Sequence, residues 1–262
     1  MLLHKHHSFK YMPRFRYPNQ IYVAFNLEPP FFTGEAIDGP MRIPSNFFNA
    51  TLDYRQSATY FHGYGRIEKA VHPEDAALLN PLEDDEALNA SVPLTLVGDC
   101  YGNCDFCVRN VSSPLFLTIQ DCEQQMLDEH YFYLAFENGQ CTDYVTEKFW
   151  KTLKMNIVPI VLRRKHFKGI VPDSVFIAAD DFKSPADMAK YLHKLIANPK
   201  LYRKYFEWRN THYLAEHRQG LCDLCRDLHF NRVPDNQPKN IYKYYSRRQC
   251  EHAAAVNILK GH

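Results

Sequence analysis

The chain has 262 residues, of which 45% are hydrophobic and 14% aromatic, and its formal net charge is +1. This composition is that of a globular protein with one large domain or two small ones, and it excludes an intrinsically disordered chain. The near-balanced charge provides no general attraction for phosphate backbones, so nucleic acid is excluded as the main partner.

Nothing in the sequence predicts a membrane anchor. No apolar run approaches the roughly 18 residues that a transmembrane helix needs. The first ten residues, MLLHKHHSFK, lack the apolar core of a signal peptide. We therefore expect membrane attachment only through an anchor that this sequence does not contain.

The cysteines and sequons both favour the oxidising secretory lumen. Eight cysteines are more than a cytosolic protein of this size usually carries without metal or redox chemistry. Three Asn-x-Ser/Thr sequons, at Asn49, Asn89 and Asn110, predict N-glycosylation.

The first part of the chain alternates short strands with loops. The first 20 residues are basic, aromatic and without a clear period, so we expect a poorly fixed arm. Residues 21–25 predict a strand, Glu28 and the two prolines after it a rigid turn, and residues 47–54 a further ordered segment. Residues 70–93 are acidic and predict a solvated linker or surface helix.

A strand-helix-strand unit is the clearest pattern in the chain. Residues 131–136 and 157–162 are short apolar runs, as expected of parallel strands buried on both faces. Between them, Val145, Phe149 and Leu153 recur at i, i+4 and i+8 and predict the buried stripe of a helix.

The opposite side of that helix is predicted to carry Tyr144, Glu147, Lys148 and Lys151. Such a face can look into the crevice at the carboxyl edge of a parallel sheet, where nucleotides bind. The alternative is an ordinary solvated helix face, and the pattern alone favours that alternative.

Further elements flank this unit. Residues 94–97 and 175–178 predict strands. Ser184 followed by Pro185 predicts the capped start of a helix. An aromatic-rich second helix is predicted after Pro199, with side chains large enough to pack across domains.

Four blocks follow one another in the second half of the chain: FYLAFENGQCTDYVTEKFW, VPIVL, VPDSVFIAADDFKSPADMAKYL and YFEWR. Their order and spacing resemble the C-terminal half of the α-1,3-fucosyltransferases, the glycosyltransferases that use GDP-fucose. The shorter blocks YVAFNLEPP, FFNATLDYR and HGYGRIEK are similar to the acceptor-side segment of that family. The resemblance implies an α/β fold of GT-B type, with two Rossmann-like domains of which the N-terminal one is incomplete.

The resemblance also implies how the chain is divided and where it works. The expected parts are an arm (1–20), a partial acceptor-side domain (21–69), a linker (70–93), a GDP-fucose-binding Rossmann-like domain (94–230) and a C-terminal tail (231–262). The implied acceptor is an N-acetylglucosamine-containing glycan or glycoprotein. The implied location is the Golgi membrane, with the catalytic domain in the lumen.

The donor-binding residues implied by the resemblance lie around the predicted helix start. Lys148 is the expected partner of the diphosphate, because it is a compact charge near a helix amino end, where backbone N–H groups favour anions. Glu147 is expected to bind the ribose hydroxyls, and Tyr144 and Asn138 are implied as further donor contacts. Without the resemblance, Tyr144 reads as a packed aromatic and Asn138 as a turn residue.

The expected catalytic base is Glu28, which matches the family's Glu-Ser-Pro position in the form Leu-Glu-Pro-Pro. Inverting transfer in one displacement needs a base for the acceptor hydroxyl. Tyr54 and Arg55 fall where the family has a Tyr-Arg-Arg segment near the cleft, although Gln56 replaces the second arginine.

No metal is predicted to be essential, since the chain lacks an Asp-x-Asp motif and GT-B enzymes do not require one; stimulation by Mn²⁺ stays open. Two Cys-x-x-Cys pairs, Cys104/Cys107 and Cys222/Cys225, could be read as a zinc site, but disulfides are favoured over zinc. Cys222 and Cys225 are expected to pair elsewhere, with Cys250 as a candidate, or to stay free.

One segment departs from the family. Residues 70–96 contain neither the tryptophan nor the diphosphate-binding arginine that the family carries there. The first βα unit of the donor domain is therefore expected to be absent or replaced. Two hypotheses follow: a fucosyltransferase, or a catalytically inactive relative that binds nucleotide or another protein.

Overall fold

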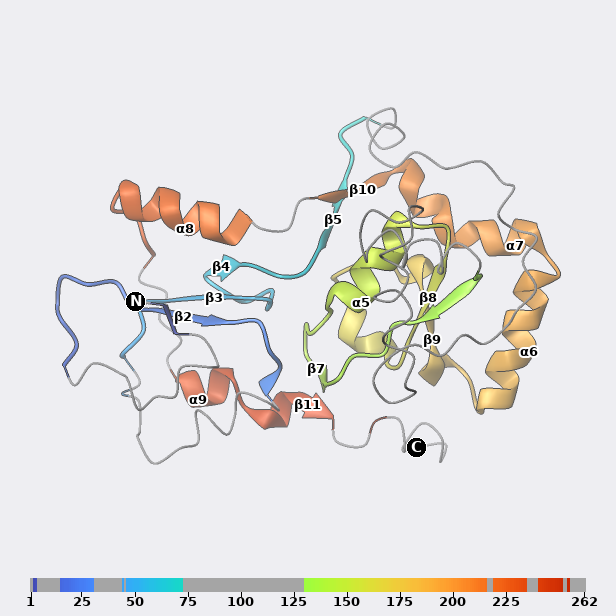
Figure 1. Cartoon of the computed structure of the whole chain (residues 1–262), viewed down its shortest axis with the longest axis horizontal. Coiled ribbons are helices and arrows are strands. Elements are labelled where there is room, and N and C mark those ends of the chain that lie inside the picture. The colour runs from blue at the N-terminus through green and yellow to red at the C-terminus, as the bar shows by residue number, and fades with distance from the viewer. Residues whose placement is uncertain are drawn as a thin grey trace, which may run out of the picture.

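The structure is a computed structural model that describes residues 2–3, 15–30, 44, 46–72, 130–215, 219–234, 240–251 and 254. Two groups of parallel strands form its two halves, and Figure 1 shows the first at the left and the second at the right. The α/β class is thereby confirmed. None of the helices in the described part of the chain is both long and apolar enough to cross a membrane.

The first sheet is parallel and has the order β1-β2-β3-β4. Its strands are β1 (Leu2–Leu3), β2 (Val23–Asn26), β3 (Ala50–Asp53) and β4 (Tyr60–Phe61). Every residue of β3 is buried, as the two-sided cover of a parallel sheet requires.

The described residues of the arm, 2–3 and 15–20, make contacts that their irregular sequence does not predict. β1 pairs with β2 in parallel register, Leu2 opposite Val23. The Arg16 guanidinium donates hydrogen bonds to the Phe47 carbonyl (2.9 Å) and to Asn49 Oδ1 (2.8 Å). The prediction of a poorly fixed arm is wrong for these residues, because their contacts are made with distant parts of the sequence.

The second sheet has the order β6-β8-β9, again all parallel. Its strands are β6 (Phe132–Leu134), β8 (Val158–Val161) and β9 (Ile177–Ala178). The crossover from β6 to β8 contains α5 (Glu147–Trp150) and the 3₁₀ helix η4 (Lys151–Lys154). The predicted strand-helix-strand unit is confirmed, although its helix tightens after one turn. The expected burial on both faces holds for β8 but is wrong for β6, where Leu134 is 49% exposed.

The buried stripe of the crossover is confirmed, but the predicted opposite face is not. Val145, Phe149 and Leu153 are all at most 3% exposed. Tyr144 is also only 3% exposed and does not share a surface with Glu147. Because α5 begins at Glu147, Tyr144 lies before the helix, and the helical period does not apply to it.

The remaining elements of the second half cover its sheet. They are η5 (Arg164–Phe167), η6 (Asp173–Val175), η7 (Ala179–Asp181), α6 (Pro185–Ile196), α7 (Pro199–Arg203) and η8 (Lys204–Asn210). Ser184 caps α6 as predicted, since its hydroxyl accepts from the Asp187 N–H at 3.1 Å. The aromatic segment packs within this half: the Tyr202 hydroxyl donates to the Tyr131 carbonyl at 2.7 Å, next to the second sheet.

Two short antiparallel pairs join distant parts of the chain. β5 (Arg66–Lys69) pairs with β10 (His212–Ala215), and β7 (Gln140–Cys141) pairs with β11 (Cys250–Glu251). The Cys141–Cys250 disulfide closes the second pair. The candidate pairing of Cys250 with Cys222 or Cys225 is therefore wrong, and those two thiols are free and exposed.

The last helices return to the first sheet. α8 (Gln219–His229) packs through Leu224 on β2, β3 and β4, and α9 (Ile241–Tyr244) covers Tyr22 and Phe47; η9 (Arg247–Gln249) follows. The implied division placed α8 in the second domain and α9 in a tail. Both pack on the first sheet instead, because its parallel strands leave an apolar face to be covered.

The cross-link gives a stability prediction. Replacing Cys250 by Ser is expected to lower the free energy of unfolding by about 2–4 kcal/mol, because the disulfide closes a loop of 109 residues. Thermal and denaturant unfolding would measure this loss. Cys222→Ser, which removes an exposed free thiol, serves as the control and should leave stability unchanged.

A glycine contact gives a second stability prediction. A Cβ atom on Gly65 would overlap with the indole of Trp150, which is 5% exposed and fixed by its Nε1–H donating to the Val145 carbonyl at 3.1 Å. We expect Gly65→Ala to destabilise the fold by about 1–3 kcal/mol, as overpacking does. A Gly65→Ala variant with the melting temperature of the wild type would contradict this, and Trp150→Phe should partly relieve the cost.

Candidate functional site

Two tyrosines mark where the ends of β2 and β6 approach each other. Burial, followed by the negative charges of Glu28, Glu147 and Glu137, raises the pKa of Tyr64 to about 12. Burial is also the main cause that raises the pKa of Tyr144, with Tyr64, Glu28 and Glu137 adding to it. The predicted base Glu28 and two predicted donor residues, Tyr144 and Glu147, therefore lie around Tyr64.

The backbone at Glu28 is fixed by its neighbours. The Glu28 N–H donates to Asn26 Oδ1 at 3.1 Å, and Asn26 Nδ2 donates back to the Glu28 carbonyl at 2.7 Å. The Tyr64 hydroxyl donates to the Leu27 carbonyl at 2.7 Å. Because Asn26 is 6% exposed, this turn is held from inside the protein, while Glu28 itself is half-buried.

The Glu28 turn also touches the loop after β6. A Cβ atom on Gly139 would lie 3.0 Å from Pro29 Cγ, so any side chain at this position would crowd the proline. Asn138, the residue before Gly139, is exposed. The predicted donor contact and the predicted base turn therefore belong to adjoining loops.

Lys148 lies among two carboxylates and a hydroxyl. Its Nζ donates to Glu147 Oε1 at 2.9 Å and to Thr146 Oγ1 at 3.2 Å, and lies 3.9 Å from Glu137 Oε2. Burial alone would raise the pKa of Glu147, but the hydrogen bond and charge of Lys148 lower it overall. Since α5 has only four residues, the ammonium group rather than the helix end can attract an anion here.

Glu137 is the site residue that the sequence analysis missed. Its side chain is 3% exposed and accepts hydrogen bonds from Thr146 N (2.7 Å) and Thr146 Oγ1 (2.6 Å). Burial raises its pKa, against the effect of the Thr146 hydrogen bonds and the Lys148 charge. The available signal was an acid three residues after the end of a parallel strand, since ligands gather at that edge of a sheet.

Tyr54 and Arg55 belong to the packing behind the site. The Tyr54 ring meets the Tyr144 ring edge-on, with centroids 5.1 Å apart, and both side chains are buried. Arg55 donates to the Tyr244 carbonyl and lies 4.4 Å over the Tyr244 ring. Arg55 therefore anchors α9, and its predicted place in the cleft is not supported by these contacts.

The carboxylate of Asp53, the residue two positions before Arg55, is fully buried. Asp53 is 0% exposed and accepts from the Tyr245 hydroxyl at 2.6 Å. Burial raises its pKa to about 6, despite the hydrogen bonds that act in the other direction. This group fastens α9 to the end of β3, so it supports the fold at the back of the tyrosine pair.

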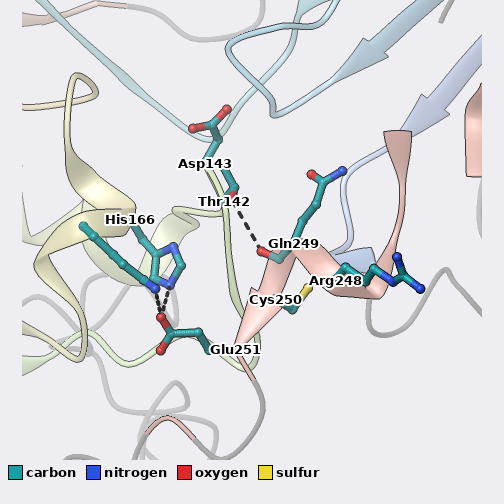
Figure 2. Close-up of a pocket in the computed structure, with 8 residues that line it drawn as sticks. Thr142, Asp143, His166, Arg248, Gln249, Cys250 and Glu251 are labelled. Atoms are coloured by element: carbon teal, nitrogen blue, oxygen red, sulfur yellow. Dashed lines mark hydrogen bonds and ion pairs between the residues drawn. The ribbon is translucent and has the colours of Figure 1, made fainter. Parts of the chain in front are cut away.

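A separate pocket of about 290 Å³ lies beside the disulfide (Figure 2). Its lining residues are Thr142, Asp143, Lys165, His166, Arg248, Gln249, Cys250 and Glu251. The His166 ring faces Glu251, with Nε2 4.0 Å from Oε1, while burial and nearby cations lower the pKa of His166 to about 4. Lys165 pairs with Glu251, and the lining has two acidic side chains, Asp143 and Glu251, and two basic ones, Lys165 and Arg248, so its formal charges balance.

The predicted glycosylation sites are placed only in part. Asn49 Oδ1 accepts from Arg16 and from the Tyr22 N–H at 2.9 Å, and Thr51 of the same sequon is buried in β3. Asn89 and Asn110 lie outside the described residues, as do the divergent segment from residue 73 onward and the cysteines at 100, 104, 107 and 122. Glycosylation at all three sequons stays a prediction.

Comparison with known families matches both halves of the chain. Residues 85–244 match the model of glycosyltransferase family 10 (fucosyltransferase), C-terminal part. Residues 1–65 match the fucosyltransferase N-terminal model. The matches follow one another in the order of the two sheets.

The individual proteins to which the chain is similar are alpha-(1,3)-fucosyltransferases. Alpha-(1,3)-fucosyltransferase fut-5 of Caenorhabditis elegans is 28% identical, over 91% of this chain and 68% of its own length. Alpha-(1,3)-fucosyltransferase fut-1 of the same organism is 33% identical over 80% of this chain and 53% of its own. Alpha-(1,3)-fucosyltransferase 4 of Homo sapiens is 32% identical over 86% and 44%, so the chain spans about half the length of the last two.

A solved structure of an alpha1,3-fucosyltransferase with GDP aligns over 84% of this chain and 82% of its own, with 14% identity and a TM-score of 0.37. A likeness this remote says nothing about individual residues. The two family matches cover most of the sequence and include both parts of the site. The chain belongs to glycosyltransferase family 10, the fucosyltransferases.

Proposed function

We propose that the chain is an α-1,3-fucosyltransferase that moves L-fucose from GDP-β-L-fucose to an N-acetylglucosamine-containing glycan with inversion. One observation carries the proposal. The turn of Glu28 in the first half packs against the loop after β6 in the second half, so closely that a Cβ atom on Gly139 would lie 3.0 Å from Pro29 Cγ; this junction is where a donor and an acceptor would meet. Family membership supports the same assignment.

In the proposed reaction, the acceptor hydroxyl oxygen attacks the anomeric carbon of fucose while the bond to the diphosphate oxygen breaks. Glu28 takes the hydroxyl proton, and the electron pair of the breaking bond leaves with GDP. Lys148 stabilises the growing negative charge on the diphosphate, because a preplaced cation counts most where charge develops. Glu147, Tyr144 and Asn138 are the proposed contacts to the nucleotide.

The proposed cellular compartment is supported by the family and by the disulfide. We place the protein in the Golgi lumen, and the Cys141–Cys250 disulfide fits an oxidising compartment. The step as written needs no essential metal, and stimulation by Mn²⁺ remains to be measured. Adding EDTA to the transfer assay tests this: lost activity would contradict the metal-free proposal.

The second candidate is a nucleotide-binding relative that does not transfer fucose. It is favoured by the absence of any arginine from residues 70–96, where the family carries one for the diphosphate. Calorimetric titration with GDP, followed by a transfer assay with GDP-fucose and a glycan, separates the two. Binding with transfer supports the enzyme, binding alone supports the inactive relative, and no binding contradicts both.

A further inference from the structure

A chain of hydrogen bonds runs from the buried Glu137 through Thr146 to Lys148. Glu137 Oε2 and Thr146 Oγ1 are 2.6 Å apart, and Thr146 Oγ1 is 3.2 Å from Lys148 Nζ. Thr146 Oγ1 also accepts from the Lys148 N–H at 3.5 Å, as the N-cap of α5. Glu137 and Lys148 are thus connected both directly, at 3.9 Å, and through one hydroxyl.

When Glu137 is ionised opposite the Lys148 ammonium, this series of hydrogen bonds has one possible direction. An ionised carboxylate only accepts hydrogen bonds, so the single proton of the Thr146 hydroxyl must point at Glu137. The lone pairs of that hydroxyl are then left for Lys148, whose ammonium only donates. Since Thr146 is 1% exposed, water does not compete for these positions.

The two carboxylates near Lys148 differ in how firmly they are held. Glu137 is 3% exposed and tied to Thr146 by two hydrogen bonds. Glu147 is 61% exposed, although it lies nearer to Lys148 Nζ, at 2.9 Å. An anion that approaches from solvent can therefore displace Glu147 from Lys148 but cannot displace Glu137.

From this difference we infer that Glu137 is a positioning residue that holds Lys148 for the donor diphosphate, while Glu147 is an exchangeable counter-ion. The inference rests on the proposed function and assigns a role to a residue outside the reacting groups. In the unliganded protein Glu147 neutralises Lys148. When a nucleoside diphosphate binds, its phosphate oxygens take the place of the Glu147 carboxylate, and Glu137 keeps the ammonium in position.

The test is Glu137→Gln in the full chain. The amide has the same shape, but its Nε2 donates a hydrogen bond to Thr146 Oγ1 where the carboxylate accepted one. It therefore competes with the two Lys148 donors for the lone pairs of that hydroxyl. We expect the affinity for GDP to fall about tenfold or more, as for the loss of a hydrogen bond to a charged group. The affinity for guanosine, which has no phosphate, should stay unchanged.

Further variants separate positioning from folding. Thr146→Val removes the connecting hydroxyl but keeps the Glu137 charge and should also weaken GDP binding selectively, whereas Thr146→Ser should keep it. Glu207→Gln makes the same chemical change at an exposed residue of η8 and should alter neither affinity. In a Lys148→Ala background, Glu137→Gln should have no further effect on GDP binding, because the two act as a unit.

The outcomes are distinct. If Glu137→Gln binds GDP like the wild type, or loses GDP and guanosine equally, the positioning role is wrong. If the wild type binds GDP without transferring fucose, the proposed enzyme activity is wrong and the positioning role stands. A wild type that binds no GDP overturns both.

Discussion

Glu28→Gln is expected to lower kcat for fucosyl transfer by about 10²- to 10⁴-fold, the usual contribution of a general base. An amide cannot take the proton of the acceptor hydroxyl, while its size is that of the acid. The Asn26 side chain accepts from the Glu28 N–H and donates to the Glu28 carbonyl, so the backbone of the turn should persist. Steady-state kinetics with GDP-fucose and a glycan acceptor would measure the change.

The binding of GDP separates catalysis from folding in this experiment. Glu28→Gln should bind GDP as the wild type does, since the base acts on the acceptor side. Glu207→Gln provides the matched control at an exposed site of the second half. Transfer at the wild-type rate by the Glu28→Gln variant would remove Glu28 from the mechanism and direct attention to other acids near Tyr64.

Lys148→Ala is expected to weaken GDP binding by about 10- to 100-fold, because it removes a charge-assisted hydrogen bond to the diphosphate. Transfer should fall further than binding, since the diphosphate gains charge as the sugar bond breaks. The substitution also leaves Glu137 buried without its cation, so a higher pKa for that carboxyl is expected. Calorimetry and transfer kinetics on the same protein would report both losses.

Lys154→Ala is the matched control for this substitution. Lys154 ends η4 on the same crossover, is exposed, and lies beyond the site along the chain. It should change neither GDP affinity nor transfer. Equal losses in the Lys154 and Lys148 variants would mean that general positive charge, and not one placed ammonium, attracts the donor; increased salt would then weaken both alike.

The local patterns predicted the second half well. The apolar runs became β6, β8 and β9, the i, i+4, i+8 stripe is buried, and Ser184 caps α6. Each of these depends on residues that are close in sequence, where backbone geometry and burial dictate the pattern. The same locality explains why Lys148 could be placed on the first turn of a helix.

The sequence did not predict the contacts between distant segments. The buried position of Tyr144 depends on Tyr54, and the partner of Cys250 is Cys141; neither pairing leaves a periodic signal in the sequence. Glu137 follows a parallel strand but also reads as an ordinary acid before Asn-Gly, and its contact with Thr146 is what distinguishes it in the structure. Sequence reasoning finds elements more easily than it finds which elements meet.

The return of α8 and α9 to the first sheet constrains the order in which the protein can fold during synthesis. Strands β2, β3 and β4 are synthesised before the second half, but the residues that cover them, Leu224 and Ile241, are made only after it. Until then the first sheet keeps an apolar face exposed, which is the condition that recruits chaperones and favours misassembly. The first half should therefore mature after the second, although it is synthesised before it.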